Sequence, residues 1–289
     1  MSNRPKLALS FDVECYYQIV RKDYLDQHIA PTEEALRNTH WIMDLLSAHD
    51  ARATMFFLGN IAETFPELVQ RAETEGHEIG VHGDQHHYVD KMEPDEFRRE
   101  IKLAMDKIYA AGASKIVGHR ATAFSINRAN MWALDILQEL GLSYDSSIFP
   151  VKAARYGVAD WPRGPEGTPD GIDEIPLSTY RLGNRNVPCM GGGYVRYFPL
   201  AYTKWCAKRL TGEGLTPVSY FHPYEFEDKR PEFTAEETAK LSPERKKAVS
   251  RMNMMQSIGR GAPMRRKLEY LVRNFKTIPV GALAPSITN

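Results

Sequence analysis

Short apolar runs alternate with longer amphipathic segments along the first half of the chain. The runs with the length and content of buried strands are residues 6–13, 53–59, 77–82 and 115–120. Between them, apolar residues recur at helical spacing; Phe97, Ile101 and Ile108, for example, fall on one face of a helix. Strands that alternate with helices in this way predict a parallel sheet with right-handed crossovers. Because no glycine-rich nucleotide fingerprint follows the first strand, the pattern favours an α/β barrel over a dinucleotide-binding sheet.

The pattern loosens after residue 144. Further strands are expected at residues 172–178, 216–223 and 275–280, with a helix near 200–211. Stretches rich in Pro and Gly predict loop insertions near 151–171 and 181–199, and a charged segment near 234–274 reads as helical in two pieces. No repeat or linker divides the chain, so we expect a single domain over residues 1–289.

Composition narrows the class of protein. Lys and Arg total 37, as do Asp and Glu, so the net charge is zero and argues against a nucleic-acid partner. The first residues lack the apolar core of a secretory signal, and no apolar run is long enough to span a membrane. We therefore expect a cytoplasmic protein. Three widely spaced cysteines, Cys15, Cys189 and Cys206, fit neither a disulfide framework nor a paired-cysteine metal site.

Polar clusters follow the expected strands at the edge where sites assemble in parallel α/β folds. These clusters contain Asp12 and Glu14, His82 with Asp84, His86 and His87, His119 with Arg120, and His222 with Glu225. His82 and His86 are four residues apart, a spacing that brings two imidazoles together on a helical turn and suits a divalent metal such as zinc. A third ligand is then needed. Asp12 and Glu14 are the candidates, because alternate residues of a strand face the same way.

The ordered motifs of the chain resemble those of one enzyme family. The segments "LALSFDVECYYQ", "ATMFFLGNIAE", "GHEIGVHGDQHH", "GHRATAFSI", "YDSSIFP" and "YFHPYEFE" are similar to the motifs of the NodB-homology polysaccharide deacetylases, carbohydrate esterase family 4. The segments "GGGYVRYFP", "FHPYEFE" and "QSIGRGAP" are similar to its cytoplasmic subset associated with exopolysaccharide and O-antigen synthesis. The resemblance implies an α/β fold of the distorted (β/α)7-barrel type that binds one divalent metal, most often Zn²⁺.

Site residues follow from this resemblance by position. The family's two histidine ligands match His82 and His86. The first motif departs from the usual pair of aspartates because Val13 stands in the second place, which implies Glu14 as the acidic ligand and Asp12 as the catalytic base. Asp12 as the ligand, or a contribution from Cys15, stays open.

The resemblance assigns the remaining steps to other strand ends. Arg120 is expected to orient Asp12, His222 to protonate the departing amine, and a backbone N–H near Tyr144–Asp145 to stabilise the oxyanion. The aromatic residues Tyr144, Tyr194 and Trp161, expected in loops at the mouth of the site, are candidates for binding a sugar ring.

The predicted function is therefore metal-dependent hydrolysis of an N-acetyl group from an amino sugar in a bacterial surface-glycan precursor. The expected partner is an N-acetylated sugar or glycan, without nucleic acid or membrane span. Two alternatives stay open. Departures at Val13 and Thr122 leave room for an allantoinase-like enzyme that hydrolyses a small cyclic amide, and Cys15 in place of an acid leaves room for a non-catalytic glycan-binding or scaffold subunit.

Overall fold

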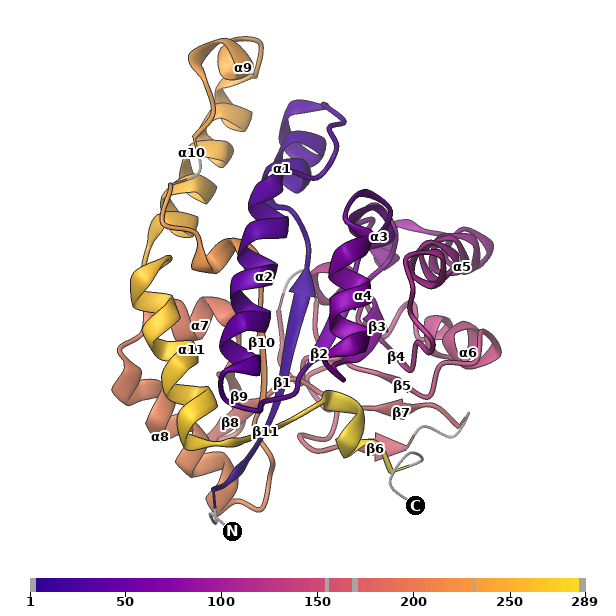
Figure 1. The fold of residues 1–289 in the computed structure, drawn as a ribbon, viewed down its shortest axis with the longest axis vertical. Helices are drawn as coiled ribbons and strands as arrows, with labels where there is room; N and C mark the ends of the chain where they lie inside the picture. The colour runs from indigo at the N-terminus through magenta and orange to yellow at the C-terminus, as the bar shows by residue number, and fades with distance from the viewer. Residues whose placement is uncertain (1–3, 154–155, 168–170, 231, 286–289) are drawn as a thin grey trace.

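The computed structural model describes residues 4–153, 156–167, 171–230 and 232–285. A curled sheet lies at the centre, and helices cover its outer face (Figure 1). Its strands are β1 Lys6–Val13, β2 Thr54–Phe57, β3 Glu78–Val81, β4 Gly118–His119, β5 Tyr144–Asp145, β6 Glu166–Gly167, β7 Asp173–Glu174, β10 Val218–Phe221 and β11 Lys276–Ile278. A separate antiparallel hairpin pairs β8 Thr179–Leu182 with β9 Arg185–Pro188.

The sheet follows the order β10-β1-β2-β3-β4-β5-β7-β6, and β11 also pairs with β1. Every pairing from β10 to β7 is parallel, and only β6 runs antiparallel to its neighbour. The path from β10 to β7 thus contains the seven parallel strands of a (β/α)7-type barrel, and the expected fold class is confirmed. Among the described residues no pairing joins β10 to β6 or β7, so the sheet is a half-barrel and not the closed sheet that the strand count suggested.

Helices follow most strands, as the apolar spacing predicts. They are α1 Tyr16–Leu25, α2 Glu33–Ser47, α3 Gly59–Thr64, α4 Pro66–Thr74, α5 Pro94–Ala110, α6 Trp132–Glu139, α7 Gly192–Tyr197, α8 Leu200–Gly212, α9 Ala235–Ala239, α10 Pro243–Ser257 and α11 Ala262–Asn274. Short 3₁₀ turns lie at Val89–Lys91, Thr122–Phe124, Pro223–Phe226 and Val280–Leu283. None of the helices in these described ranges is both long and apolar enough to cross a bilayer.

Local sequence explains where individual helices begin. In α5, Glu93 and Glu96 form a capping box around Pro94, which suits the first helical position because it needs no N–H partner there. The apolar run after β2 reads as one helix, but Pro66 divides it into α3 and α4, since proline cannot continue the hydrogen-bond ladder.

Several segments differ from their sequence expectation. The helix α1 follows β1 directly and was not predicted. Residues 181–199, expected as a loop, contain the end of the β8–β9 hairpin and all of α7, and the segment 234–274 forms three helices in place of two. Part of the other expected loop, residues 154–155 and 168–170, lies outside the described residues. The short hairpin and the Gly-rich start of α7 carry too few apolar positions to show a period.

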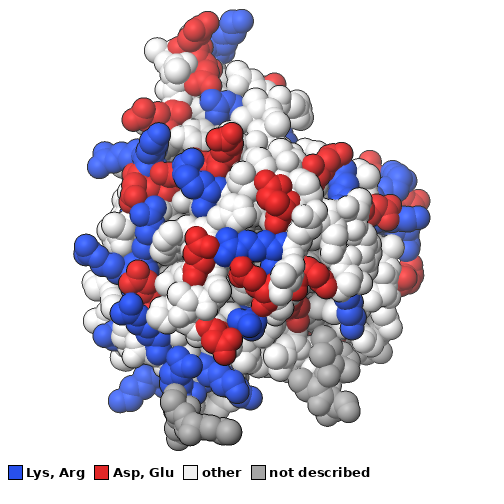
Figure 2. All heavy atoms as spheres, viewed as in Figure 1, with Lys and Arg blue, Asp and Glu red and all other residues white. Residues whose placement is uncertain are grey.

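Apolar side chains fill both faces of the sheet. Leu7 and Leu9 of β1 belong to the larger core cluster, whereas Ala8 belongs to a second cluster with Phe56 and Tyr144. Because strand residues alternate, the larger cluster lies against the helices and the smaller one inside the half-barrel. The interior is tight: a Cβ at Gly118 would lie 2.1 Å from the Tyr144 ring. Figure 2 shows acidic and basic side chains interspersed over one outer face of the molecule.

Candidate functional site

The carboxyl end of β1 places two acidic side chains on the inner side of the sheet. Asp12 and Glu14 are 1% and 3% exposed. Both approach one histidine, which follows β10: His222 Nε2 lies 3.8 Å from Asp12 Oδ2 and 3.8 Å from Glu14 Oε1. The expectation that alternate residues of this strand face one pocket is therefore met, because β10 pairs directly beside β1.

Two histidines after β3 meet Glu14 on the same rim. His82 Nε2 lies 3.4 Å and His86 Nε2 3.2 Å from Glu14 Oε2. The turn between the histidines is not helical, contrary to expectation. Gly83 and His86 adopt positive φ angles of 86° and 57°, so a tight bend joins the two rings. Among the described residues, Glu14, His82 and His86 form the group of side chains arranged to hold a metal ion.

The donor atoms of this triad fit a tetrahedral metal. Ligands 2.0–2.1 Å from a zinc ion are roughly 3.3 to 3.4 Å apart, close to the separations between Glu14 and each imidazole. His82 Nδ1 lies 2.8 Å from the Arg120 carbonyl oxygen. A carbonyl can only accept, so Nδ1–H is the donor and the unprotonated Nε2 is free to act as a ligand. Glu14 Oε2 is buried without a hydrogen-bond donor. Burial alone would raise the pKa of Glu14, but the imidazoles of His86 and His222 hold that pKa well below its usual range.

Arg120 fixes the second carboxylate. Its Nη1 donates to Asp12 Oδ1 at 2.8 Å and to Ser10 Oγ at 2.7 Å, and its Nε and Nη2 donate to the Ser146 carbonyl and hydroxyl, both at 3.0 Å. The guanidinium also lies 4.3 Å from the centre of the Phe56 ring. Arg120 is fully buried, so these contacts leave Asp12 one oriented oxygen free on the pocket side.

His222 is held by residues of its own turn. Its ring stacks on Tyr224 at 4.9 Å, and Nδ1 lies 3.5 Å from Glu225 Oε2. Burial alone would lower the pKa of His222, but the carboxylates of Glu14 and Glu225 outweigh burial and raise that pKa to about 9. Glu225 is itself buried 3.4 Å from Arg196 Nε.

Two connected cavities open from these side chains. The first, about 190 Å³, contains the triad, Asp12 and His222. The second, about 920 Å³, shares Ile19, Phe124 and Met252 with it. Aromatic side chains line the larger cavity: Tyr24, Tyr88, Phe124, Phe149, Tyr156, Tyr194, Tyr197 and Tyr220. A small polar centre thus lies beside a wide aromatic groove.

The expected substrate-binding aromatics separate in the structure. Tyr194 lines the groove from α7. Tyr144 does not lie in a loop at the mouth: it belongs to β5, is fully buried, and donates its hydroxyl proton to Glu78 at the start of β3. Its backbone N–H bonds the Val117 carbonyl in the sheet, so it is not free for an oxyanion. Trp161 packs against the helix-side core and is absent from the lining of both cavities.

Two neighbours of the triad lie outside it. Cys15 is buried, and its Sγ lies 3.4 Å from Thr32 Oγ1, on the side of β1 away from the histidines. His87 has a half-exposed side chain whose Nδ1 lies 3.3 Å from Glu100 Oε1. The carboxylate arrangement and these contacts favour Glu14 over Asp12 and Cys15 as the acidic member of the triad.

Sequence reasoning missed the residues that cover the centre. Tyr16 and Ile19 of α1 and Met252 and Gln256 of α10 line the smaller cavity. The spacing of Tyr16 and Ile19 with Val20 is helical and was a usable signal. The helix α10 has a single buried side chain, that of Val249, so its apolar pattern gave no sign of a role at the site.

Comparisons with known proteins agree with this geometry. Residues 5–144 match the family model for polysaccharide deacetylase, and residues 146–283 match a domain of unknown function, DUF3473. A peptidoglycan-N-acetylglucosamine deacetylase of Bacillus cereus is 44% identical over 66 residues, 23% of this chain and 24% of that protein. A chitooligosaccharide deacetylase of Rhizobium leguminosarum bv. trifolii is 30% identical over 137 residues, 47% of this chain and 56% of that protein.

A solved structure shares the fold over almost the whole chain. The crystal structure of a protein assigned as a polysaccharide deacetylase from Mycobacterium smegmatis aligns with a TM-score of 0.57 and 19% identity, over 96% of this chain and 93% of that one. The curated relatives are matched over little more than half of their own length at most. The matched region contains Asp12, the triad and Arg120. Residues 5–144 of this chain therefore belong to the polysaccharide deacetylase family.

Proposed function

We propose that the protein is a metal-dependent hydrolase that removes the N-acetyl group from an amino sugar. The observation that carries the proposal is the Glu14, His82 and His86 triad beside an Asp12 held by Arg120. The relatives' activities support the same reaction, since both are named as deacetylases of N-acetylglucosamine-type glycans. The carboxylate and imidazole donors of the triad suit zinc, and a divalent ion held there would polarise the amide carbonyl and the attacking water.

The chain's own side chains divide the proton transfers. Asp12 accepts the proton of the attacking water, and Arg120 keeps its carboxylate ionised and aimed at the cavity. His222, on the other side of the same cavity, donates a proton to the nitrogen that leaves as an amine. His222 Nε2 lies 3.8 Å from Asp12 Oδ2 and 3.8 Å from Glu14 Oε1, beyond hydrogen-bond distance. The proposed acid, His222, and the proposed base, Asp12, are therefore separate groups beside the same reacting carbon.

The groove supports a glycan as substrate. Its volume of about 920 Å³ exceeds what one sugar needs, and aromatic rings such as Tyr194 offer faces for sugar rings. Its charged lining residues are Asp23, Asp90 and Lys91, which give no excess of positive charge for a diphosphate. We propose that the substrate is an oligosaccharide precursor of a bacterial surface glycan, in line with the motifs "GGGYVRYFP", "FHPYEFE" and "QSIGRGAP" of the second half of the chain. The cytoplasmic location stays a prediction.

Metal analysis combined with acetate release tests the function. The purified protein is expected to hold one zinc per chain and to release acetate from N-acetylated oligosaccharides. His82→Ala and His86→Ala should abolish metal binding, whereas His87→Ala, a matched loss of a neighbouring imidazole, should leave it intact. Equal losses in all three variants would contradict the proposed ligand set.

Two outcomes favour the alternatives. Turnover of a small cyclic amide without bound metal would indicate the allantoinase-like enzyme. A metal-loaded protein that binds N-acetylated glycans but releases no acetate from any of them would indicate the non-catalytic subunit. If the wild type releases acetate and an Asp12→Asn protein keeps its metal but loses this turnover, the non-catalytic subunit is excluded.

A further inference from the structure

The metal-ligand loop contains a strained backbone. His86 adopts a φ of 57°, in the left-handed region that residues other than glycine rarely enter. The loop from His82 to Tyr88 has no regular secondary structure, so no helix or sheet ladder holds His86 in this conformation. Residues in such conformations cost of order 1 to 3 kcal/mol and persist only when surrounding contacts fix them. Some contact must therefore maintain the direction of the His86 ring.

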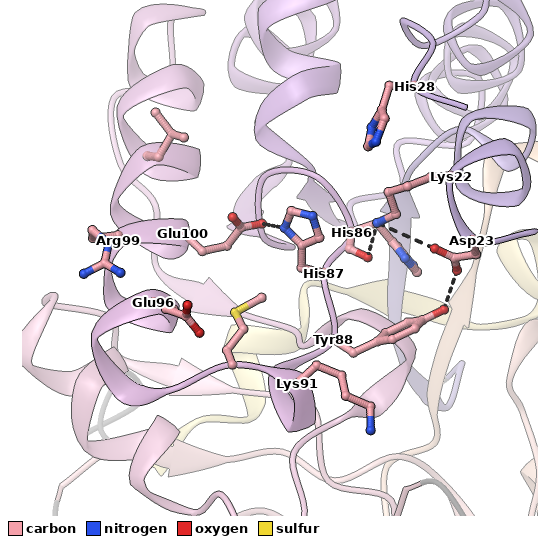
Figure 3. A pocket seen from close by; sticks show the side chains of 12 residues that line it. Lys22, Asp23, His28, His86, His87, Tyr88, Lys91, Glu96, Arg99 and Glu100 are labelled. Atoms are coloured by element: carbon pink, nitrogen blue, oxygen red, sulfur yellow. Dashed lines mark hydrogen bonds and ion pairs between the residues drawn. The ribbon is translucent and has the colours of Figure 1, made fainter. Parts of the chain in front are cut away.

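Glu100 accepts from the backbone N–H groups of Asp84 and Gln85, and Thr122 donates to the His87 carbonyl, but Lys22 of α1 binds the backbone at His86 itself. Its Nζ donates to the Gln85 carbonyl at 2.5 Å and to the His86 carbonyl at 2.8 Å. Figure 3 shows the Lys22 side chain reaching across the pocket wall to the His86 backbone. The side chain is only 15% exposed, and its nearest carboxylate oxygen, on Asp23, is farther away at 3.8 Å. The two carbonyls are thus its short-range partners.

A second contact joins α1 to the same loop. The Tyr88 hydroxyl donates to Asp23 Oδ2 at 2.6 Å, so adjacent residues of α1 hold the chain at His86 and two residues beyond it (Figure 3). By comparison, the other histidine of the triad is oriented from its ring, through the Arg120 carbonyl. His86 Nδ1 is buried and has no hydrogen-bond partner; its ring lies edge-on to Tyr88, 5.7 Å between centroids, so the orientation of His86 depends on its backbone and on this ring contact.

We propose that Lys22 is a positioning residue for the metal centre: it fixes the left-handed backbone at His86 and thereby aims that imidazole at Glu14 and the metal. The inference rests on the metal centre of the proposed function. Contacts that orient a metal ligand without touching the metal typically contribute 10- to 100-fold to metal affinity.

The direction in which metal affinity changes when Lys22 is replaced distinguishes a positioning role from a purely electrostatic one. A lysine ammonium repels a divalent cation nearby, so removal of its charge alone would strengthen metal binding. Removal of a contact that orients a ligand would weaken it. A change of Lys22 to an uncharged residue therefore gives opposite results under the two explanations.

The experiment compares zinc affinities by competition with a chelator. Lys22→Met should weaken zinc binding by about 10- to 100-fold, and it should alter the visible spectrum of the cobalt-substituted protein. Lys22→Arg, which keeps donors at this position, should lie closer to the wild type. The control is Arg21→Met on the same helix: it removes the same charge from a side chain that pairs with Glu237 and leaves zinc affinity undiminished.

The outcomes are distinguishable. Unchanged or stronger zinc binding by Lys22→Met, with the wild type binding one zinc, overturns the positioning role and leaves the proposed function standing. A wild type that binds no divalent metal overturns the proposed function itself. Thermal unfolding of the metal-free proteins checks the fold, and Lys22→Gln, a polar helix-forming change with the same expected direction, replaces Lys22→Met if that variant fails to fold.

Discussion

Replacing Arg120 by methionine tests how much the ion pair between Arg120 and Asp12, the proposed base, contributes to stability and to turnover. The guanidinium is fully buried and donates four hydrogen bonds, at 2.7 to 3.0 Å, to Ser10, Asp12 and Ser146. Methionine has a similar length but no donors. The change leaves the Asp12 carboxylate, 1% exposed, without its charged partner.

The expected cost follows from this burial. Removal of one partner from a buried ion pair typically destabilises a protein by about 3 to 5 kcal/mol, because the remaining charge is neither solvated nor paired. In a chain of this size each kcal/mol lowers the melting temperature by roughly 1.6 °C, so Arg120→Met should lower it by about 5 to 8 °C. Turnover should fall by 10²-fold or more, since Asp12 loses its orientation.

A double variant identifies the cause. If the unpaired Asp12 charge accounts for most of the loss, the double variant Asp12→Asn/Arg120→Met should be more stable than Arg120→Met alone. Its free energy of unfolding should be higher by about 1 to 2 kcal/mol, and its urea midpoint should be higher as well. Urea unfolding followed by circular dichroism measures all the proteins. A double variant no more stable than Arg120→Met would refute the reasoning, because the lost energy would then come from the hydrogen bonds to Ser10 and Ser146 or from packing against Phe56, and not from the ion pair.

Three further predictions concern separate residues. His222→Ala should retain the metal and lower turnover by about 10²- to 10⁴-fold, as expected for a general acid; metal analysis beside acetate release checks it. Gly192→Ala would place a Cβ 2.1 Å from Glu225 Oε2, so we expect it to displace Glu225 from His222 and reduce turnover at unchanged metal content. For His77, burial lowers the pKa to about 4, below its unfolded value near 6.5. The unfolded state therefore binds the proton first, and between pH 7.5 and 4.5 the wild type should lose about 2 to 3 kcal/mol more stability than His77→Phe in urea unfolding.

The spacing of apolar residues was sufficient to predict most strands and helices of the half-barrel. The strands β1, β2 and β3 and the helices α2 and α5 lie where apolar spacing places them, because each buries one face against the sheet. The expected strand at residues 115–120 contains β4. The spacing did not reveal α1, whose ten residues mix charged and aromatic side chains, or the two-residue strand β5. The openness of the sheet depends on long-range pairing, which no local pattern records.

Site residues could be predicted from the sequence where the strand that carries them could be predicted. Glu14, His82, His86 and Asp12 follow predicted strands, so their convergence could be inferred from topology. Tyr144 was misplaced because a two-residue strand looks like a loop in sequence, and its ring turns toward Glu78 in the interior. Lys22 could not have been found, because its effect depends on the positive φ of His86, a property of the folded bend.

The strand β1 pairs with strands from both matched regions, β2 from the first and β10 and β11 from the second. The three side chains proposed to hold the ion, Glu14, His82 and His86, all come from the first region, whereas His222 comes from the second. Under the proposed function, the metal would be held by the first matched region alone, and the proton for the amine would come from the second. Loss of His222 by itself would then leave a protein that still binds the metal but lacks the acid that releases the amine.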